Sequence, residues 1–331
     1  SIVINDPIYI FEKNGYKSKY QKGEINNFTY LLLINKYASR TYNDNNQYLI
    51  FPLLVIDAFK RKIRDLSKAI CLNQDDIDKN SFEDNYQKFG SHFNSHYSTS
   101  GYLFYYLLRL NPFTIGHIKL QSGHFDTPER IFSTWNNHLV ALSSSRENRE
   151  LCPELFYIYD AFINLNHNNL GYIRSEKLRI NDFDTNYECG IFEFIINMRH
   201  LLENSNISPW IDNIFGCNQI NESDDLINIF PKSSYEQFNN FEETKKKLEK
   251  KGTSKKDLIN QIKTSICLLG LGITPAQLFK VNHPIKTLIN KRTCSFFQLG
   301  TVTNNIEKII DIPHKDFYNF ISPMKYKRLN L

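Results

Sequence analysis

Apolar side chains recur at helical spacing in several stretches of the chain. Residues 27–37 carry such a stripe, and Asn26 or Asn27 can cap its start. Three more segments are long and apolar enough to be buried helices: Gly101 to Leu110, Glu154 to Leu165 and Phe192 to Glu203. The pattern therefore predicts a mainly α protein.

Other segments fit no helix. Residues 1–17 alternate apolar and polar side chains, which predicts a strand-like lead-in. Residues 40–53 and 91–98 mix polar side chains with aromatic residues typical of cores, and they fit neither the helical nor the strand period. If such segments are buried, side chains must pair their backbone groups, because regular secondary structure does not. We predict that residues 40–53 and 64–68 are largely buried and irregular. The candidate partners are Asn43, Asp44, Gln47, Arg64, Asp65 and Ser67.

The composition indicates a large folded unit. The chain has 331 residues, of which 41% are hydrophobic and 14% aromatic, enough for one large domain or two ordinary ones with an irregular core. Its net charge of +5 is compatible with acidic lipids or nucleic acid and establishes neither. The six cysteines form no CxxC pair, so the sequence predicts neither a zinc cage nor a disulfide framework. No apolar run approaches the roughly 18 residues that a membrane span requires.

A lysine-rich run occupies Lys245 to Lys256. Glutamates are interspersed and Gly252 interrupts it, so a solvated helix and loop is the favoured interpretation, with a patch for anionic lipid or nucleic acid as the alternative. Beyond Pro284 the helical cues become fewer, and residues 295–302 predict a strand.

Candidate catalytic groups are weakly supported. His92 and His96 could share one helix face and bind a metal, but no Glu lies between them as in HExxH, so structural hydrogen bonding is favoured. His124, Asp126 and Arg130 could form an acid–base cluster, yet neither a nucleophile elbow nor a phosphate-binding glycine loop accompanies them. We therefore predict no enzymatic activity, no catalytic residue, no metal and no cofactor; an enzyme that uses the His96 or His124 region is the competing hypothesis.

Several charged and aromatic residues are expected to be structural. Arg64 beside Asp65, and Arg40 near Asp44, are predicted to form core ion pairs rather than catalytic groups. Trp210 stands among Ile211, Ile214 and Phe215, which favours a core position over an exposed hot spot for a partner.

A series of motifs along the chain resembles the BEACH domain family in content and order. It begins with YQKGEINNFTYL at residues 20–31, where Tyr20 stands in place of the family's Trp. The series continues with SRTYND (39–44), QY (47–48), FP (51–52), RDLSK (64–68), SHYS (95–98), NPFT (111–114), LQSGHFD (120–126), WID (210–212) and LGITP (271–275). Departures from the family pattern occur at Ser39, Leu49, Leu53 and Ala69. The order of so many short matches makes coincidence improbable.

The resemblance implies a fold and a function. The fold is mainly α, with helices surrounding a core of extended segments without regular secondary structure. The function is that of a non-enzymatic scaffold for protein–protein interactions in vesicle trafficking and membrane dynamics, in a cytoplasmic protein that associates peripherally with intracellular, including endolysosomal, membranes. The residues expected to hold the motifs together are Tyr42, Asn43, Asp44, Gln47, Arg64, Asp65, Ser67, His96, Tyr97, Arg109, Asp126, Arg130, Trp210 and Asp212.

The resemblance also implies a domain order. Residues 1–19 would be a linker that follows a PH-like domain, residues 20–284 the BEACH domain, and residues 285–331 an extension towards a WD-repeat propeller. The expected partners are the PH-like domain of the same polypeptide and trafficking proteins, with indirect or peripheral membrane association and no nucleic acid.

Overall fold

The computed structural model describes residues 6–57, 62–73, 79–142, 147–174, 178–185, 190–220, 226–235 and 272–287. Within these ranges helices dominate, so the predicted mainly α class is confirmed. The α-helices are α1 (Pro7–Lys13), α2 (Tyr16–Gln21), α3 (Asn27–Tyr37), α4 (Asn80–Phe89), α5 (Ser100–Tyr106), α6 (Phe113–Leu120), α7 (Trp135–Leu142), α8 (Gly190–Asn204) and α9 (Ser208–Ile214).

Shorter elements join these helices. The 3₁₀ turns are η1 (Cys71–Asn73), η2 (Pro128–Arg130), η3 (Pro153–Phe156), η4 (Tyr159–Phe162) and η5 (Lys232–Ser234). Strand β1 (Val55–Asp57) pairs with β2 (Lys62–Ile63), and β3 (Tyr172–Ile173) pairs with β4 (Leu178–Arg179); both ribbons are antiparallel. Ribbons this small cannot organise a core, so the helices and the irregular segments must do it.

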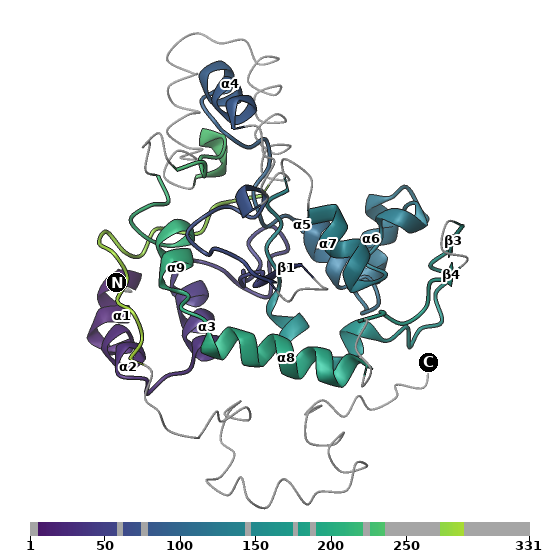
Figure 1. Cartoon of the computed structure of the whole chain (residues 1–331), viewed down its shortest axis with the longest axis horizontal. Coiled ribbons are helices and arrows are strands. Elements are labelled where there is room, and N and C mark those ends of the chain that lie inside the picture. Colours follow the sequence, from purple (N-terminus) through teal and green to yellow (C-terminus); the bar gives the residue numbers. More distant parts are fainter. Residues whose placement is uncertain are drawn as a thin grey trace, which may run out of the picture.

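The helices surround a centre built from irregular chain. Figure 1 shows α8 along one edge of the domain, with α1, α2 and α3 near one of its ends and α5, α6 and α7 on the other side. Between them pass residues 48–54, whose Phe51, Leu53 and Leu54 side chains are completely buried. Phe51 forms an isolated antiparallel bridge with Leu151, which brings two irregular segments together. The expected core of extended segments is therefore present in the described residues.

Helix α3 forms as its sequence predicts. Asn26 accepts a hydrogen bond from Thr29 N at 2.7 Å, so the predicted side-chain cap is confirmed. A second cap comes from another part of the chain, since the Glu203 carboxylate accepts from the backbone N–H groups of Asn27 (2.7 Å) and Phe28 (3.2 Å). A negative group at a helix N-terminus is favourable, and here it also fixes α3 against the end of α8.

The strand-like lead-in predicted for residues 1–17 is wrong where the structure describes it. Asp6 caps α1 by accepting from Ile8 N, and Pro7 occupies the first helical position, where its missing N–H costs nothing. Phe11 is buried, and its ring lies within 6.0 Å, between centroids, of four other aromatic rings. The segment is too short for a count of alternating residues to distinguish a strand from two short helices.

Two of the predicted buried helices are also different in the structure. Residues 154–165 form the 3₁₀ turns η3 and η4 instead of one helix, and α5 ends at Tyr106 rather than at Leu110. A short apolar run that is buried on all sides carries no periodicity to distinguish these forms. The prediction for residues 192–203 is confirmed by α8. The lysine run 245–256 and the predicted strand 295–302 lie outside the described residues.

Candidate functional site

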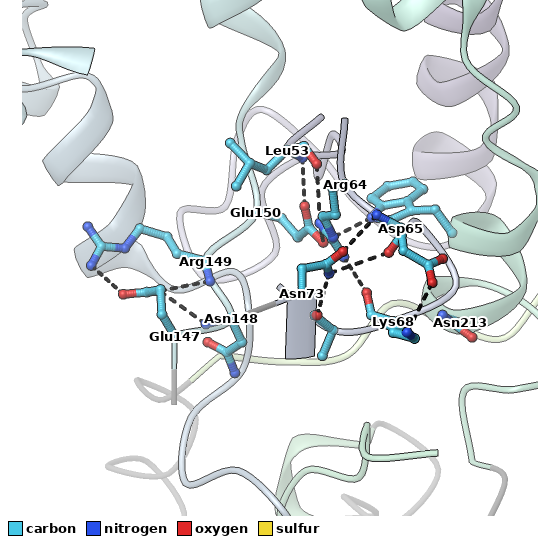
Figure 2. A network of polar contacts seen from close by, with 12 residues as sticks. Leu53, Arg64, Asp65, Lys68, Asn73, Glu147, Asn148, Arg149, Glu150 and Asn213 are labelled. Atoms are coloured by element: carbon cyan, nitrogen blue, oxygen red, sulfur yellow. Dashed lines mark hydrogen bonds and ion pairs between the residues drawn. The ribbon is translucent and has the colours of Figure 1, made fainter. Parts of the chain in front are cut away.

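The polar centre of the domain is the carboxylate of Glu150. Its Oε1 accepts from Arg64 Nη1 at 2.7 Å and from Trp210 Nε1 at 3.0 Å, and its Oε2 accepts from the backbone N–H of Leu53 at 2.8 Å. Figure 2 shows Glu150 and Arg64 facing each other beneath Leu53. One buried carboxylate thus joins three segments that are far apart in the sequence.

Arg64 belongs to this centre, but its predicted partner does not. The Arg64 guanidinium also donates to the carbonyls of Leu53 (3.3 Å) and Lys68 (2.9 Å) and makes no ion pair with Asp65. Asp65 is exposed; it accepts from the N–H and the hydroxyl of Ser67 and pairs loosely with Lys68 at 3.4 Å. The predicted Arg64–Asp65 core pair is therefore wrong, because neighbours along an irregular chain point in opposite directions.

Trp210 lies in the core, as its sequence context predicts. It is completely buried in α9, and its ring packs against Phe215 with 5.7 Å between centroids. Asp212, two residues further along α9, accepts from the backbone N–H of His283 at 2.7 Å. Burial raises the pKa of Asp212, and the His283 hydrogen bond opposes that shift. Both residues attach α9 to its surroundings.

Arg40 is buried, and it fixes irregular backbone rather than pairing with Asp44. Its guanidinium donates to the carbonyls of Asn46, Tyr48 and Ile273. Because the group is desolvated, its pKa is lowered to about 10.

Asp44 closes a local turn instead. It accepts from Asn46 N at 2.9 Å and Gln47 Nε2 at 3.3 Å, while Tyr42 and Asn43 are exposed. The segment 40–53 is irregular as predicted, but the prediction that it is largely buried is wrong for residues 42–47, which are exposed or half-buried. The same prediction for residues 64–68 is wrong at positions 65, 67 and 68, which are exposed. Asp44, Gln47 and the side chains beside them therefore form the surface edge of the segment 40–53.

The two candidate metal-binding histidines have separate structural partners. His92 Nδ1 accepts from Ile229 N at 3.1 Å, and its ring stacks on Tyr86. His96 Nδ1 accepts from Ser98 N at 3.3 Å, and its ring touches that of Tyr97. Burial lowers the pKa of both imidazoles. Across the residues described, no group of three or more His, Cys, Asp or Glu side chains is arranged to hold a metal ion.

The remaining predicted residues are separated from one another. Arg109 is buried and donates to the carbonyls of Phe132 (2.7 Å) and Asn181 (2.9 Å). Arg130 is exposed on η2, and Asp126 accepts from the neighbouring Thr127 N–H at 2.7 Å. His124 is exposed as well. The His124–Asp126–Arg130 segment thus lies at the surface, and the three side chains have no hydrogen bond or ion pair with one another in this structure.

Several central groups were missed by the sequence analysis. Besides Glu150 and Glu203, they include Glu154, which accepts from the Tyr48 hydroxyl at 2.6 Å and whose pKa is raised by burial. Asn35 is another, because it exchanges hydrogen bonds with both backbone groups of Ile50. The sequence did contain a signal, because Glu150 and Glu154 each stand directly before two apolar residues, at 151 and 152 and at 155 and 156. A glutamate among such residues can be buried, and a buried carboxylate needs a partner.

A small cavity adjoins the polar centre. It has a volume of about 40 Å³ and is lined by Arg64, Tyr97, Asn148, Glu150 and Trp210, among others. One water needs roughly 10 to 15 Å³ of such space, so there is room for a few molecules of that size. The described residues that line this cavity include no serine or cysteine nucleophile beside a base. The polar centre beside this cavity therefore holds backbone segments in place.

The comparisons with known proteins agree with the motif resemblance. The sequence model of the Beige/BEACH domain matches residues 18–286. BEACH domain-containing protein B of Arabidopsis thaliana is 33% identical over 81% of the chain, and BEACH domain-containing protein lvsD of Dictyostelium discoideum is 33% identical over 81%. BEACH domain-containing protein lvsE of Dictyostelium discoideum is 33% identical over 86%. The chain spans only 9–14% of the length of these relatives.

Proposed function

The chain belongs to the Beige/BEACH domain family, and from this premise we propose that it is a non-enzymatic scaffold for protein–protein interactions in vesicle trafficking and membrane dynamics. In this proposal it works in the cytoplasm, at the surface of intracellular membranes. Of the helices that the structure describes, none is both long and apolar enough to cross a bilayer. Any membrane contact made by those helices would then be peripheral.

The observation that supports a scaffold is the role of the buried polar groups. Arg40, Arg64 and Arg109 all use their guanidinium groups to hold backbone carbonyls of other segments, which are those of Ile273, Leu53 and Phe132 respectively. A catalytic group must instead be accessible to a substrate, whereas these three side chains are buried. A domain whose polar interior fixes its own shape is suited to presenting a rigid outer surface to partners.

The first partner that we propose is a PH-like domain of the same polypeptide. The curated relatives are seven or more times longer than the stretch they share with this chain, so this domain works within larger proteins in those cases. A domain tethered by a short linker is present at an effective concentration in the millimolar range and needs little intrinsic affinity. The interface can therefore be modest, roughly 600 to 1,500 Å².

A longer polypeptide that carries the upstream segment tests this proposal. NMR relaxation should show the two domains tumbling as one body, and calorimetry should detect binding between the separate pieces. Independent tumbling together with no measurable binding would exclude the interface. Affinity purification of the longer polypeptide from cells should then recover trafficking proteins, and recovery of none would count against the scaffold role.

A further inference from the structure

Lysines gather where α2 meets the last described segment. Residues 16–24 and 279–287 carry five lysines and one glutamate, a net charge of +4, while the whole chain carries +5. We call the five lysines, Lys17, Lys19, Lys22, Lys280 and Lys286, together with Val281 and Ile285, the basic corner. The net charge of these two short segments, +4, is thus nearly as large as that of the whole protein, +5.

Contacts place the two segments side by side. Thr287 N donates to Gln21 O at 2.8 Å, Lys17 Nζ lies 5.7 Å from the centre of the Phe279 ring, and Figure 1 shows the segment passing α1 and α2. Tyr20 and His283 point inward from the two segments, with 5.8 Å between their ring centres. The two segments therefore run side by side, and Lys19, Lys22 and Lys280 are exposed along them.

Two aliphatic side chains stand out among these lysines. Val281 is 64% exposed and Ile285 is 66% exposed, and each is next to a lysine in the sequence, Lys280 and Lys286 respectively. Single exposed aliphatic residues are common and need no explanation. A pair within a strongly basic surface is the arrangement that suits a bilayer interface, which attracts the lysines and accepts apolar groups below its headgroups.

We propose that the basic corner binds the surface of membranes that contain anionic lipids. The stems of the exposed Lys19, Lys22 and Lys280 can lie along the apolar boundary while their ammonium groups reach the phosphates and carboxylates of the headgroups. Lys17 and Lys286 are half-buried and add positive charge nearby, and Lys286 Nζ donates to Asn27 Oδ1 at 3.1 Å. Nucleic acid is a poorer fit, because neither segment contains the arginines that contact bases and phosphates bidentately, and the exposed aliphatic pair offers no surface for base stacking.

The basic corner contains no residue of the lysine run at 245–256, and it deepens the proposed function by assigning the membrane contact to named residues. Vesicle binding is measured on this chain without a PH-like domain, so its outcome does not depend on whether that domain binds. A chain that fails to bind that domain can still bind vesicles. The two proposals can therefore fail separately.

The test measures binding of the chain to phosphatidylcholine vesicles with and without about 30% phosphatidylserine. The wild-type chain should bind the anionic vesicles, and its binding should weaken as salt is raised. The triple variant Lys19→Gln, Lys22→Gln, Lys280→Gln should bind about 100-fold more weakly, about fivefold for each lysine. These three side chains are exposed, so the variant should keep the melting temperature of the wild type.

A matched control removes three exposed lysines elsewhere, with the substitutions Lys79→Gln, Lys88→Gln and Lys119→Gln. It changes the net charge equally and should bind much as the wild type does. If the corner variant binds as tightly as this control, the proposal is wrong. A further variant neutralises four lysines of the run at residues 245–256, namely Lys245, Lys246, Lys247 and Lys250. If this variant loses binding while the corner variant does not, the lipid contact belongs to that run instead.

A fluorescence measurement tests insertion directly. Both native tryptophans, Trp135 and Trp210, are buried, so the variant Ile285→Trp adds one exposed reporter. Its emission should shift to shorter wavelength with anionic vesicles and stay unchanged with phosphatidylcholine alone. Unchanged emission with both, or an equal shift with double-stranded DNA, would refute the membrane assignment.

Discussion

Arg64 Nη1 and Glu150 Oε1 lie 2.7 Å apart although 86 positions separate the two residues, and both side chains are only 3% exposed. Each charge is fully desolvated and depends on the other for compensation. The same Glu150 carboxylate also holds Trp210 and the backbone of Leu53. Within the described residues, we therefore expect loss of one member of this ion pair to destabilise the fold more than loss of a charge elsewhere.

Replacing Glu150 with Ala should lower the free energy of unfolding by about 3 to 5 kcal/mol, because Arg64 would remain charged and buried without its partner. Urea denaturation measures the change. The exposed ion pair of Lys68 with Asp65 is the control. Loss of this pair in Asp65→Ala should lower the free energy of unfolding by less than about 1 kcal/mol. Equal losses for the two substitutions would show that the Glu150 carboxylate is not a central contact.

Asn35 should be needed to hold irregular backbone in the core. Its side chain donates to Ile50 O at 3.0 Å and accepts from Ile50 N at 2.9 Å. Asn35→Ala would leave both groups buried without partners, and we expect a loss of about 2 to 4 kcal/mol. Asn43→Ala, at an exposed position, should change the unfolding free energy by less than about 0.5 kcal/mol. A small effect at Asn35 would mean that the backbone of Ile50 finds other partners.

Gly272→Ala should destabilise the domain more than Gly123→Ala. Both glycines have positive φ, +97° and +99°, so each substitution carries backbone strain of roughly 1 to 3 kcal/mol. A Cβ at Gly123 meets open space, whereas one at Gly272 would lie 2.5 Å from both His96 Cβ and Ser98 O. We expect overpacking at Gly272 to add about 1 to 3 kcal/mol. Thermal unfolding of both variants measures the difference, which should vanish if residue 272 can move away.

His138 should make the protein less stable in mild acid. Burial, with a smaller contribution from Arg149, holds its pKa well below the ordinary value, so the folded protein keeps this ring neutral. Once the pH falls below about 6.5 the unfolded chain binds a proton there that the folded chain does not, and stability falls by about 1.4 kcal/mol per pH unit.

The variant His138→Gln isolates this contribution, since groups with raised pKa values such as Glu154 act in the opposite direction. Unfolding free energies near pH 7.5 and pH 5.5 should differ less in the variant than in the wild type. His124→Gln, at an exposed position, is the control for the substitution itself and should change the unfolding free energy near pH 7.5 by less than about 0.5 kcal/mol. An unchanged dependence in His138→Gln would mean that the ring is protonated in the folded protein.

Local signals explain which parts of this structure were predictable from sequence. Helix α3 and its Asn26 cap depend on residues within one or two turns, and both were identified correctly. The partner of Arg64 was not, because proximity in sequence favoured Asp65 while the actual partner comes from a segment 86 residues away. Side-chain contacts between segments far apart in the sequence hold this irregular core. The spacing of residue types along the chain does not predict such contacts. The family motifs indicated which segments are important for the fold, but not which residues of those segments contact one another.

The segment 272–287 also affects how the domain forms during synthesis. Ala276 N donates to Ala38 O at 3.1 Å, and the Tyr30 hydroxyl meets His283 at 2.8 Å. At roughly 5 to 20 residues per second, the ribosome takes about 12 to 50 s to make the roughly 240 residues between Ala38 and Ala276. Throughout that interval the nascent α3 lacks part of its covering, so its apolar face is available to chaperones until the end of the domain emerges.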